Sequence, residues 1–223
     1  MQIVVAHYEE DLSWLSKIPS HWDVVVYMKS PNLLGTSIYG KILERTRSIF
    51  FLPNFGRESQ TFLYHIVENY DNLDDLTFFC QGWPFDHVNF FFDLVAQKNI
   101  HDMEQVVMNN TCKNGLQRSD IGFIGCGNVW RRDMRKSFMK RFDGILIPKC
   151  EELWSDYFKD CPRIFRTGHG GQYIATKKFL RRIPKKVYVD LLDRHEEACM
   201  PWVLEVVLAE MLLEFYNKRT HML

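Results

Sequence analysis

The stretch Leu76–His87, Leu-Thr-Phe-Phe-Cys-Gln-Gly-Trp-Pro-Phe-Asp-His, decides the fold class. Its apolar run is short for a helix and ends at a glycine and a proline, so the pattern predicts a buried strand. Asp86 and His87 follow that strand directly. Open α/β sheets bind ligands just beyond the carboxyl ends of their strands. Because a carboxylate and an imidazole can hold a divalent metal there, we expect a metal that binds a diphosphate. The alternatives are that Asp86 is a turn residue making an Asx hydrogen bond and that His87 is a surface or core histidine.

Similar short apolar runs recur along the first half of the chain. A segment with apolar residues at helical spacing lies between the third run and the stretch that begins at Leu76. This rhythm predicts an α/β fold with a central, mostly parallel mixed sheet flanked by helices. Expected strands cover residues 3–6, 24–27, 49–52, 162–165 and 172–176, and expected helices cover residues 57–70, 131–141 and 196–218. The sequence shows no repeat or convincing linker, so we expect one domain over residues 1–223.

The composition restricts the classes of partner. The 28 basic and 28 acidic residues balance, which argues against binding to nucleic acid. No apolar segment is long enough to span a bilayer, and the amino terminus reads as a strand rather than a signal peptide. The cysteines show no C-x-x-C spacing, so reduced thiols in the cytoplasm are the simplest interpretation: Cys80, Cys112, Cys126, Cys150, Cys161 and Cys199.

Polar side chains gather at the predicted strand ends and at the start of the first long helix. If the sheet is parallel, they share one rim, where an aromatic ring can stack on a base and cations can neutralise a diphosphate. The alternatives are structural: a core tyrosine, a helix amino terminus, and an arginine paired with a neighbouring acid. The candidate cofactor-binding residues on this rim are Ala6, His7, Tyr8, Glu9, Lys29 and Arg57.

A second candidate site is the segment Gly168-His169-Gly170-Gly171. Gly170 and Gly171 let the backbone approach a ligand closely, and His169 can add a metal ligand or contact a phosphate. A tight turn between strands has the same composition.

A carboxylate near a pocket can serve as a general base that takes a proton from a reacting group. The candidates for this base are Glu205, Glu197 and Asp143. Each can equally be a solvated position on a helix or at a helix terminus.

Four segments, taken in order, resemble known proteins. They are residues 4–14 (Val-Val-Ala-His-Tyr-Glu-Glu-Asp-Leu-Ser-Trp), Asn54-x-Gly56-Arg57-Glu58, residues 64–71, and Phe79-x-Gln81-Gly82-x-Pro84-Phe85-Asp86-His87. The pattern resembles a widespread uncharacterised family with fungal and bacterial members. It is also similar to the glycosyltransferase domain with which chlorella viruses decorate their capsid protein. The resemblance covers about the first ninety residues well and the remainder loosely.

The resemblance implies a single GT-A type, Rossmann-like domain that uses a UDP-sugar and Mn²⁺ or Mg²⁺. The implied reaction moves a hexose or deoxyhexose to a glycan or glycoprotein, in the host cytoplasm if the chain is viral. In that fold an Asp-x-Asp element binds the metal, whereas Pro84-Phe85-Asp86-His87 has a single acid. His87 or His169 would then complete the ligand set, and Lys29 or Arg57 would neutralise the leaving diphosphate.

Two other functions are compatible with the same residues. A metal-dependent nucleotide phosphohydrolase would need a denser carboxylate cluster than Asp86 and His87 supply. A non-catalytic nucleotide-sugar-binding module would explain the absence of a second aspartate.

Overall fold

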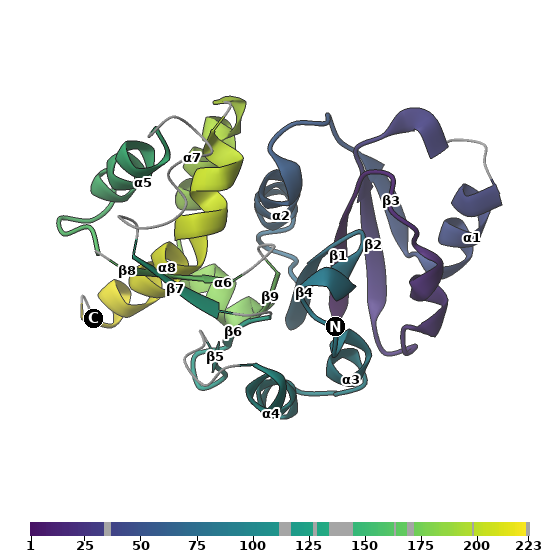
Figure 1. Cartoon of the computed structure of the whole chain (residues 1–223). Coiled ribbons are helices and arrows are strands. Elements are labelled where there is room, and N and C mark those ends of the chain that lie inside the picture. Colours follow the sequence, from purple (N-terminus) through teal and green to yellow (C-terminus); the bar gives the residue numbers. More distant parts are fainter. Residues whose placement is uncertain are drawn as a thin grey trace.

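A computed structural model describes residues 1–33, 37–111, 117–126, 129–133, 145–162, 164–168, 172–197 and 199–221. Its centre is a mixed sheet of seven strands with helices on both faces, as the sequence pattern predicts (Figure 1). Asp143, His169, Gly170 and Gly171 lie outside the described residues.

The strand order is β3-β2-β1-β4-β9-β6-β5. Neighbours among β1 to β4 pair in parallel, whereas β9 pairs antiparallel with both β4 and β6, and β5 pairs antiparallel with β6. The sheet is therefore parallel in the half that carries the predicted rim and antiparallel in the other half. The strands are β1 (Gln2–His7), β2 (Asp23–Met28), β3 (Ser48–Phe51), β4 (Leu76–Gln81), β5 (Gln117–Arg118), β6 (Phe123–Gly125) and β9 (Tyr173–Thr176).

Helices connect and cover these strands. The α-helices are α1 (Ser37–Arg45), α2 (Arg57–Glu68), α3 (Phe91–Val95), α4 (Ile100–Asn110), α5 (Leu146–Ser155), α6 (Lys177–Arg182), α7 (Lys185–Asp193) and α8 (Met200–His221). Short 3₁₀ turns are η1 (Ser13–Lys17), η2 (Pro31–Leu33), η3 (Pro84–Asp86) and η6 (Arg194–Glu196). The long apolar helix expected near the carboxyl end is confirmed as α8.

A two-stranded antiparallel ribbon, β7 (Val129–Asp133) and β8 (Ile164–Gly168), lies beside α8 (Figure 1). The expectation of a basic helix over residues 131–141 is wrong at its beginning, because Arg131 pairs with Arg166 in this ribbon. Strand pairing with a distant segment overrides the local composition there. Residues 134–144 lie outside the described part of the chain.

Alternate residues of the central strands enter two separate cores. Val4 and Phe79 point toward α2 and α8, whereas Val5 and Phe78 point toward η1, α3 and α4. Successive side chains of a strand face opposite sides, so strands covered on both faces are apolar throughout. This explains the unbroken apolar runs of β1, β2 and β4.

Among the described residues, no helix combines the length and the apolar character needed to cross a bilayer.

Candidate functional site

The order in which the chain adds strands to the parallel half of the sheet reverses at β1. The chain passes from β1 to β2 and β3 on one side of β1, and then places β4 on the other side. In open α/β sheets, ligands bind in the crevice outside the carboxyl ends of the strands at such a switch point. The carboxyl ends of β1 and β4 are His7 and Gln81, so the crevice is expected at these two residues.

A cavity of about 280 Å³ opens at this point, and we call it the rim cavity. Its wall comes from the ends of β1 and β4, the segments after β1, β2 and β3, and the first turn of α2. The lining residues are Ala6, His7, Tyr8, Glu10, Lys29, Asn54, Arg57, Glu58 and Gln81. The structure thus brings together five of the six rim residues that the sequence predicts.

Hydrogen bonds fix the segment after β1. The Tyr8 N–H donates to Glu10 Oε2 (2.8 Å), and His7 Nε2 lies 2.9 Å from the carbonyl oxygen of Glu10. The Tyr8 side chain remains 43% exposed although its backbone is held. Its ring therefore offers an exposed aromatic face at the mouth of the rim cavity, which suits stacking on a planar base.

Glu9 has a different position from its neighbours. Its Oε1 accepts hydrogen bonds from Ser30 Oγ (3.0 Å) and Asn32 Nδ2 (2.9 Å). It thereby ties the segment after β1 to the segment after β2, and it does not line the rim cavity. We therefore expect Glu9 to support the rim rather than to touch a ligand.

Lys29 is only 7% exposed, and its side chain connects the end of β2 to the start of α2. Its ammonium donates to the carbonyl oxygens of Phe55 (2.7 Å) and Arg57 and to Gln60 Oε1 (2.6 Å). Burial lowers the pKa of Lys29 to about 8, and the Glu58 carboxylate opposes part of this shift. Because three acceptors already use the ammonium, we expect Lys29 to hold the start of α2 rather than to bind phosphate, which revises its predicted role.

The start of α2 has an unusual backbone. Gly56 and Arg57 have φ angles of +68° and +50°, and no side chain caps the helix. A Cβ on Gly56 would lie 2.5 Å from Gln60 Cβ and 2.6 Å from His195 Cδ2, so only glycine fits. Positive φ is uncommon for arginine and indicates local strain that the surroundings must hold.

This helix end is a candidate anion site. The first N–H groups of a helix carry partial positive charge and attract phosphate. The Arg57 guanidinium lies 4.1 Å from the centre of the Trp202 ring on α8, and its Nε lies 3.4 Å from Glu58 Oε2. The guanidinium is thus held at the rim cavity beside the helix amino terminus.

His195 contacts the first turn of α2 through Ser59. His195 Nδ1 lies 3.0 Å from the carbonyl oxygen of Leu191, and Nε2 lies 3.1 Å from Ser59 Oγ. Since Nδ1 faces a carbonyl, we assign it the proton. The Ser59 hydroxyl also donates to the carbonyl oxygen of Gly56 (3.0 Å), which ties the ring contact to the turn. Burial lowers the pKa of His195 to about 4, so the ring is neutral at pH 7. The contact joins residues 136 positions apart, and no local pattern in the sequence indicates it.

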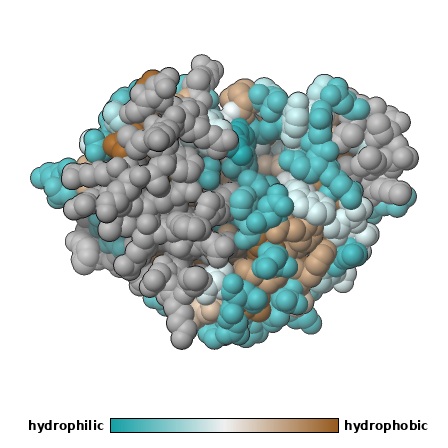
Figure 2. Space-filling view, viewed as in Figure 1, coloured by the Kyte–Doolittle hydropathy of each residue, from teal (hydrophilic) through white to brown (hydrophobic). Residues whose placement is uncertain are grey.

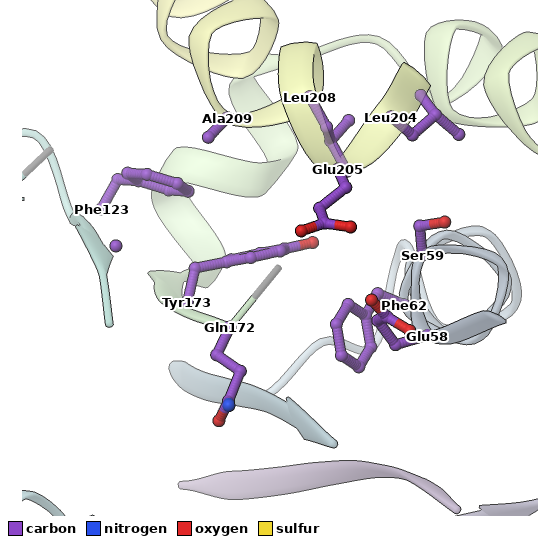
Figure 3. Close-up of a pocket in the computed structure, with 11 residues that line it drawn as sticks. Glu58, Ser59, Phe62, Phe123, Gln172, Tyr173, Leu204, Glu205, Leu208 and Ala209 are labelled. Carbon is purple, nitrogen blue, oxygen red and sulfur yellow. The ribbon is translucent and has the colours of Figure 1, made fainter. Parts of the chain in front are cut away.

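A second, smaller cavity adjoins the first. This inner cavity has a volume of about 30 Å³, enough for about one water, and Glu58 lines both cavities. Figure 3 shows Glu205 reaching from α8 toward the hydroxyl end of Tyr173. The remaining lining residues are Ser59, Phe62, Phe123, Gly125, Gln172, Leu204, Leu208 and Ala209.

The inner cavity contains a polar atom whose hydrogen-bonding capacity is unused. Tyr173 Oη is buried and has no hydrogen-bond partner within the described structure. The Gln172 amide points away from it, toward the carbonyl oxygen of Pro84 (Figure 3). Burial raises the pKa of the Tyr173 hydroxyl, so it remains a donor. Native proteins pair such groups with water or a ligand. The inner cavity is therefore suited to a water molecule or a hydroxyl group beside the Glu205 carboxylate.

The predicted metal ligands are not assembled in the described part of the chain. Asp86 ends η3 and is exposed, and His87 is partly exposed. Neither lines the rim cavity or the inner cavity. The described residues contain no group of three or more His, Cys, Asp or Glu side chains that could hold a metal. The acids on the rim cavity are Glu10 and Glu58 instead.

The three candidate bases differ in their surroundings. Glu205 lines the inner cavity. Glu197 is exposed, and its Oε2 lies 3.2 Å from Lys149 Nζ in a surface ion pair. Asp143 lies outside the described residues. Of the two described candidates, Glu205 alone faces a cavity that adjoins the rim.

Several lining residues were not predicted as site residues. Glu58 and Ser59 follow Arg57 directly, and the glycine before that arginine is the signal that could have indicated them. Gln172 and Tyr173 lie in and beside a strand that the sequence did predict. Their orientation depends on β9 pairing with β4 and β6, which local sequence does not encode.

A family model described as "Protein of unknown function (DUF3431)" matches residues 3–211. The chain belongs to this family. The DUF3431 match includes β1 to β4, α2, β9 and the part of α8 that carries Trp202 and Glu205, and so it contains both cavities. A search among curated proteins found no match.

Proposed function

We propose that this protein is a glycosyltransferase that moves a hexose or deoxyhexose from a UDP-sugar to a glycan or glycoprotein. The observation that carries the proposal is the rim cavity at the β1/β4 switch point, with Arg57 and the uncapped start of α2 on one side and Tyr8 at its mouth. A flat ring, a cation and the N–H groups at a helix amino terminus match the base and diphosphate of such a donor.

The donor is arranged by the chain's own groups. The diphosphate lies against the first turn of α2, where Arg57 and the helix dipole neutralise its charge. The base stacks on Tyr8. Lys29 acts indirectly, because its hydrogen bonds to Phe55 and Arg57 keep this turn in its strained conformation.

The reaction is a displacement at the first carbon of the sugar. The acceptor oxygen forms a bond to this carbon as the carbon–oxygen bond to the diphosphate breaks, and the electron pair leaves with the nucleoside diphosphate. Arg57 and the α2 N–H groups stabilise the charge that develops on the leaving group. Glu205 takes the proton of the acceptor hydroxyl, since it is the candidate base that faces a cavity adjoining the rim.

The proposed reaction includes no step that uses a protein-bound divalent cation. Asp86 and His87 alone do not provide the ligand set that a protein-held metal needs, and the described residues bring no further acid or imidazole to them. Dependence on Mn²⁺ or Mg²⁺ is therefore measured separately.

Thermal denaturation with UDP, GDP or CMP, each with and without Mn²⁺, tests donor binding. Selective binding to the native state raises Tm, and we expect the largest rise with UDP. Arg57→Ala should lose this rise, whereas Arg47→Ala, which removes an exposed surface ion pair with Asp23, should keep it. The absence of a shift with all three nucleotides in the native protein would overturn the proposal.

Product analysis then separates the three candidate activities. Incubation with UDP-sugars should yield UDP together with free sugar or a glycosylated acceptor. Release of phosphate from UDP itself would indicate a phosphohydrolase. Tight binding of UDP-sugar without turnover in the presence of acceptor mixtures would indicate a non-catalytic binding module.

A further inference from the structure

A group of partly exposed aromatic rings lies on the segment from the end of β4 to the first turn of α3. Trp83 is 39% exposed, Phe92 is 37% exposed, and Phe85 lies between them and is partly buried. The ring centres of Trp83 and Phe85 are 4.8 Å apart, and those of Phe85 and Phe92 are 5.3 Å apart. We call these three residues the aromatic patch. Figure 2 shows apolar surface gathered over this part of the molecule, with hydrophilic side chains around it.

Buried neighbours hold the aromatic patch in place. Phe85 packs edge-on against the buried rings of Trp14 (6.0 Å) and Phe91 (5.5 Å). Trp14 Nε1 donates a hydrogen bond of 2.8 Å to the carbonyl oxygen of Gly82, the residue before Trp83. The rings are thus arranged before any ligand arrives, which reduces the entropy lost on binding.

The aromatic patch follows directly in the chain after a residue that lines the rim cavity. Gln81 lines the cavity, and Trp83 follows two residues later. Gly82 lies between them, where a Cβ would come within 2.8 Å of Glu10 Cδ and 3.2 Å of His7 Cδ2. The patch is therefore fixed against the segment that also holds Tyr8 at the cavity mouth.

Polar residues belong to the same segment as the aromatic rings. Asp86 and Asn89 are exposed and His87 is partly exposed, and all three belong to the same short segment. Lys17 Nζ lies 5.6 Å from the centre of the Phe92 ring. A pyranose has an apolar face of C–H groups and an edge of hydroxyl groups, so it matches rings bordered by hydrogen-bonding side chains. A protein partner in a stable dimer would need about 2,000 Å² of more continuous apolar surface.

We propose that the aromatic patch binds a pyranose ring of the acceptor glycan, which stacks on Trp83 and Phe92 while Asp86 bonds its hydroxyl groups. This rests on the proposed function and identifies the acceptor as a carbohydrate. It also gives Asp86 a role at the acceptor instead of at a metal. Gly82, which packs against Glu10 and His7, joins the patch to the segment that lines the rim cavity, where the donor is proposed to bind.

Fluorine NMR of protein labelled with 5-fluorotryptophan tests acceptor binding without any donor. The Trp83 signal among the six tryptophans is identified with Trp83→Phe. Titration with methyl glycosides of common hexoses and deoxyhexoses should shift this signal in a saturable way, with a Kd on the order of 1–10 mM. Phe92→Ala and Asp86→Asn should weaken binding about five- to tenfold, and Phe51→Ala, an exposed phenylalanine on edge strand β3, should not.

The outcomes separate this inference from the proposed function. If UDP raises Tm but no glycoside moves the Trp83 signal, the acceptor proposal is wrong and the donor site stands. If glycosides bind while UDP has no effect, the proposed transferase fails and the carbohydrate site stands. Loss of a Mn²⁺-dependent UDP shift in Asp86→Asn would overturn the role given to Asp86. Dimers that dissociate in Trp83→Ala, measured by sedimentation, would make the patch a contact between copies and overturn the proposal.

Discussion

Replacement of Lys29 by methionine tests how the donor site is held. Methionine keeps most of the apolar stem and removes the ammonium that bonds Phe55 O, Arg57 O and Gln60 Oε1. Without these bonds, the positive φ angles of Gly56 and Arg57 lose their main polar support. We therefore expect both the stability of the protein and the affinity for UDP to fall.

The size of the loss can be worked out from two opposing contributions. A buried acceptor left without a partner costs about 1–3 kcal/mol, so three of them cost about 3–9 kcal/mol. Removing the buried charge returns part of this, since a pKa lowered from 10.5 to about 8 corresponds to about 3 kcal/mol. Water from the rim cavity can pair with some of the acceptors. The net destabilisation should be about 2 kcal/mol, or about 4–8 °C in Tm.

Calorimetry of the native protein, Lys29→Met and Lys185→Met provides the comparison. Lys185 is exposed in the first turn of α7, so its replacement should change stability by less than about 0.5 kcal/mol. If Lys29→Met melted within about 1 °C of the native protein and bound UDP equally well, Lys29 would not hold the start of α2 and the reasoning would be refuted.

Three further predictions follow from the same geometry. Gly56→Ala should destabilise the fold by about 2–5 kcal/mol, because a Cβ there adds strain at φ +68° and overlaps His195. Urea unfolding measures this change, and a loss of stability below about 0.5 kcal/mol would contradict the assigned backbone conformation. Burial lowers the pKa of both His65 and His195 to about 4, below the 6.5 of the unfolded chain, so the unfolded state binds protons first as the pH falls. Stability should be constant above about pH 6.5 and should drop between pH 6.5 and 4 by up to about 3 kcal/mol per histidine, and a pH series of unfolding curves that is flat across this window for the native protein would disprove it. Glu205→Gln should lower kcat about 10²–10⁴-fold and leave the UDP-induced rise in Tm unchanged, and unaltered turnover would remove Glu205 as the base.

Local sequence patterns predict the parallel half of the fold well. The apolar runs of β1, β2 and β4 and the helical spacing of α2 each contain enough information, because these strands are covered on both faces and the helix has one apolar stripe. The edge strand β3 is predicted by its apolar run, although Phe50 and Phe51 are exposed. Parallel pairing then brings their carboxyl ends to one rim. The rim location of His7, Tyr8 and Arg57 follows from these elements alone.

Contacts between distant segments explain what the sequence could not reveal. The antiparallel insertion of β9 beside β4 directs Tyr173 toward Glu205 and creates the inner cavity, and nothing near Tyr173 in the sequence indicates this pairing. Lys29 was predicted to neutralise a diphosphate because it follows a strand end. Its three hydrogen-bond acceptors belong to another segment of the chain, so the local sequence gives no sign of them. Asp86 was predicted as a metal ligand because it follows a strand end; the 3₁₀ turn that begins at Pro84 leaves it on the surface and outside both cavities.

A crystal structure of the protein with UDP-glucose tests the central claim most directly. The account predicts that the diphosphate contacts Arg57 and the first N–H groups of α2, with the uracil ring against Tyr8 and the glucose toward Glu58. Nucleotide bound anywhere else, with the rim cavity empty at saturating UDP-glucose, would contradict it.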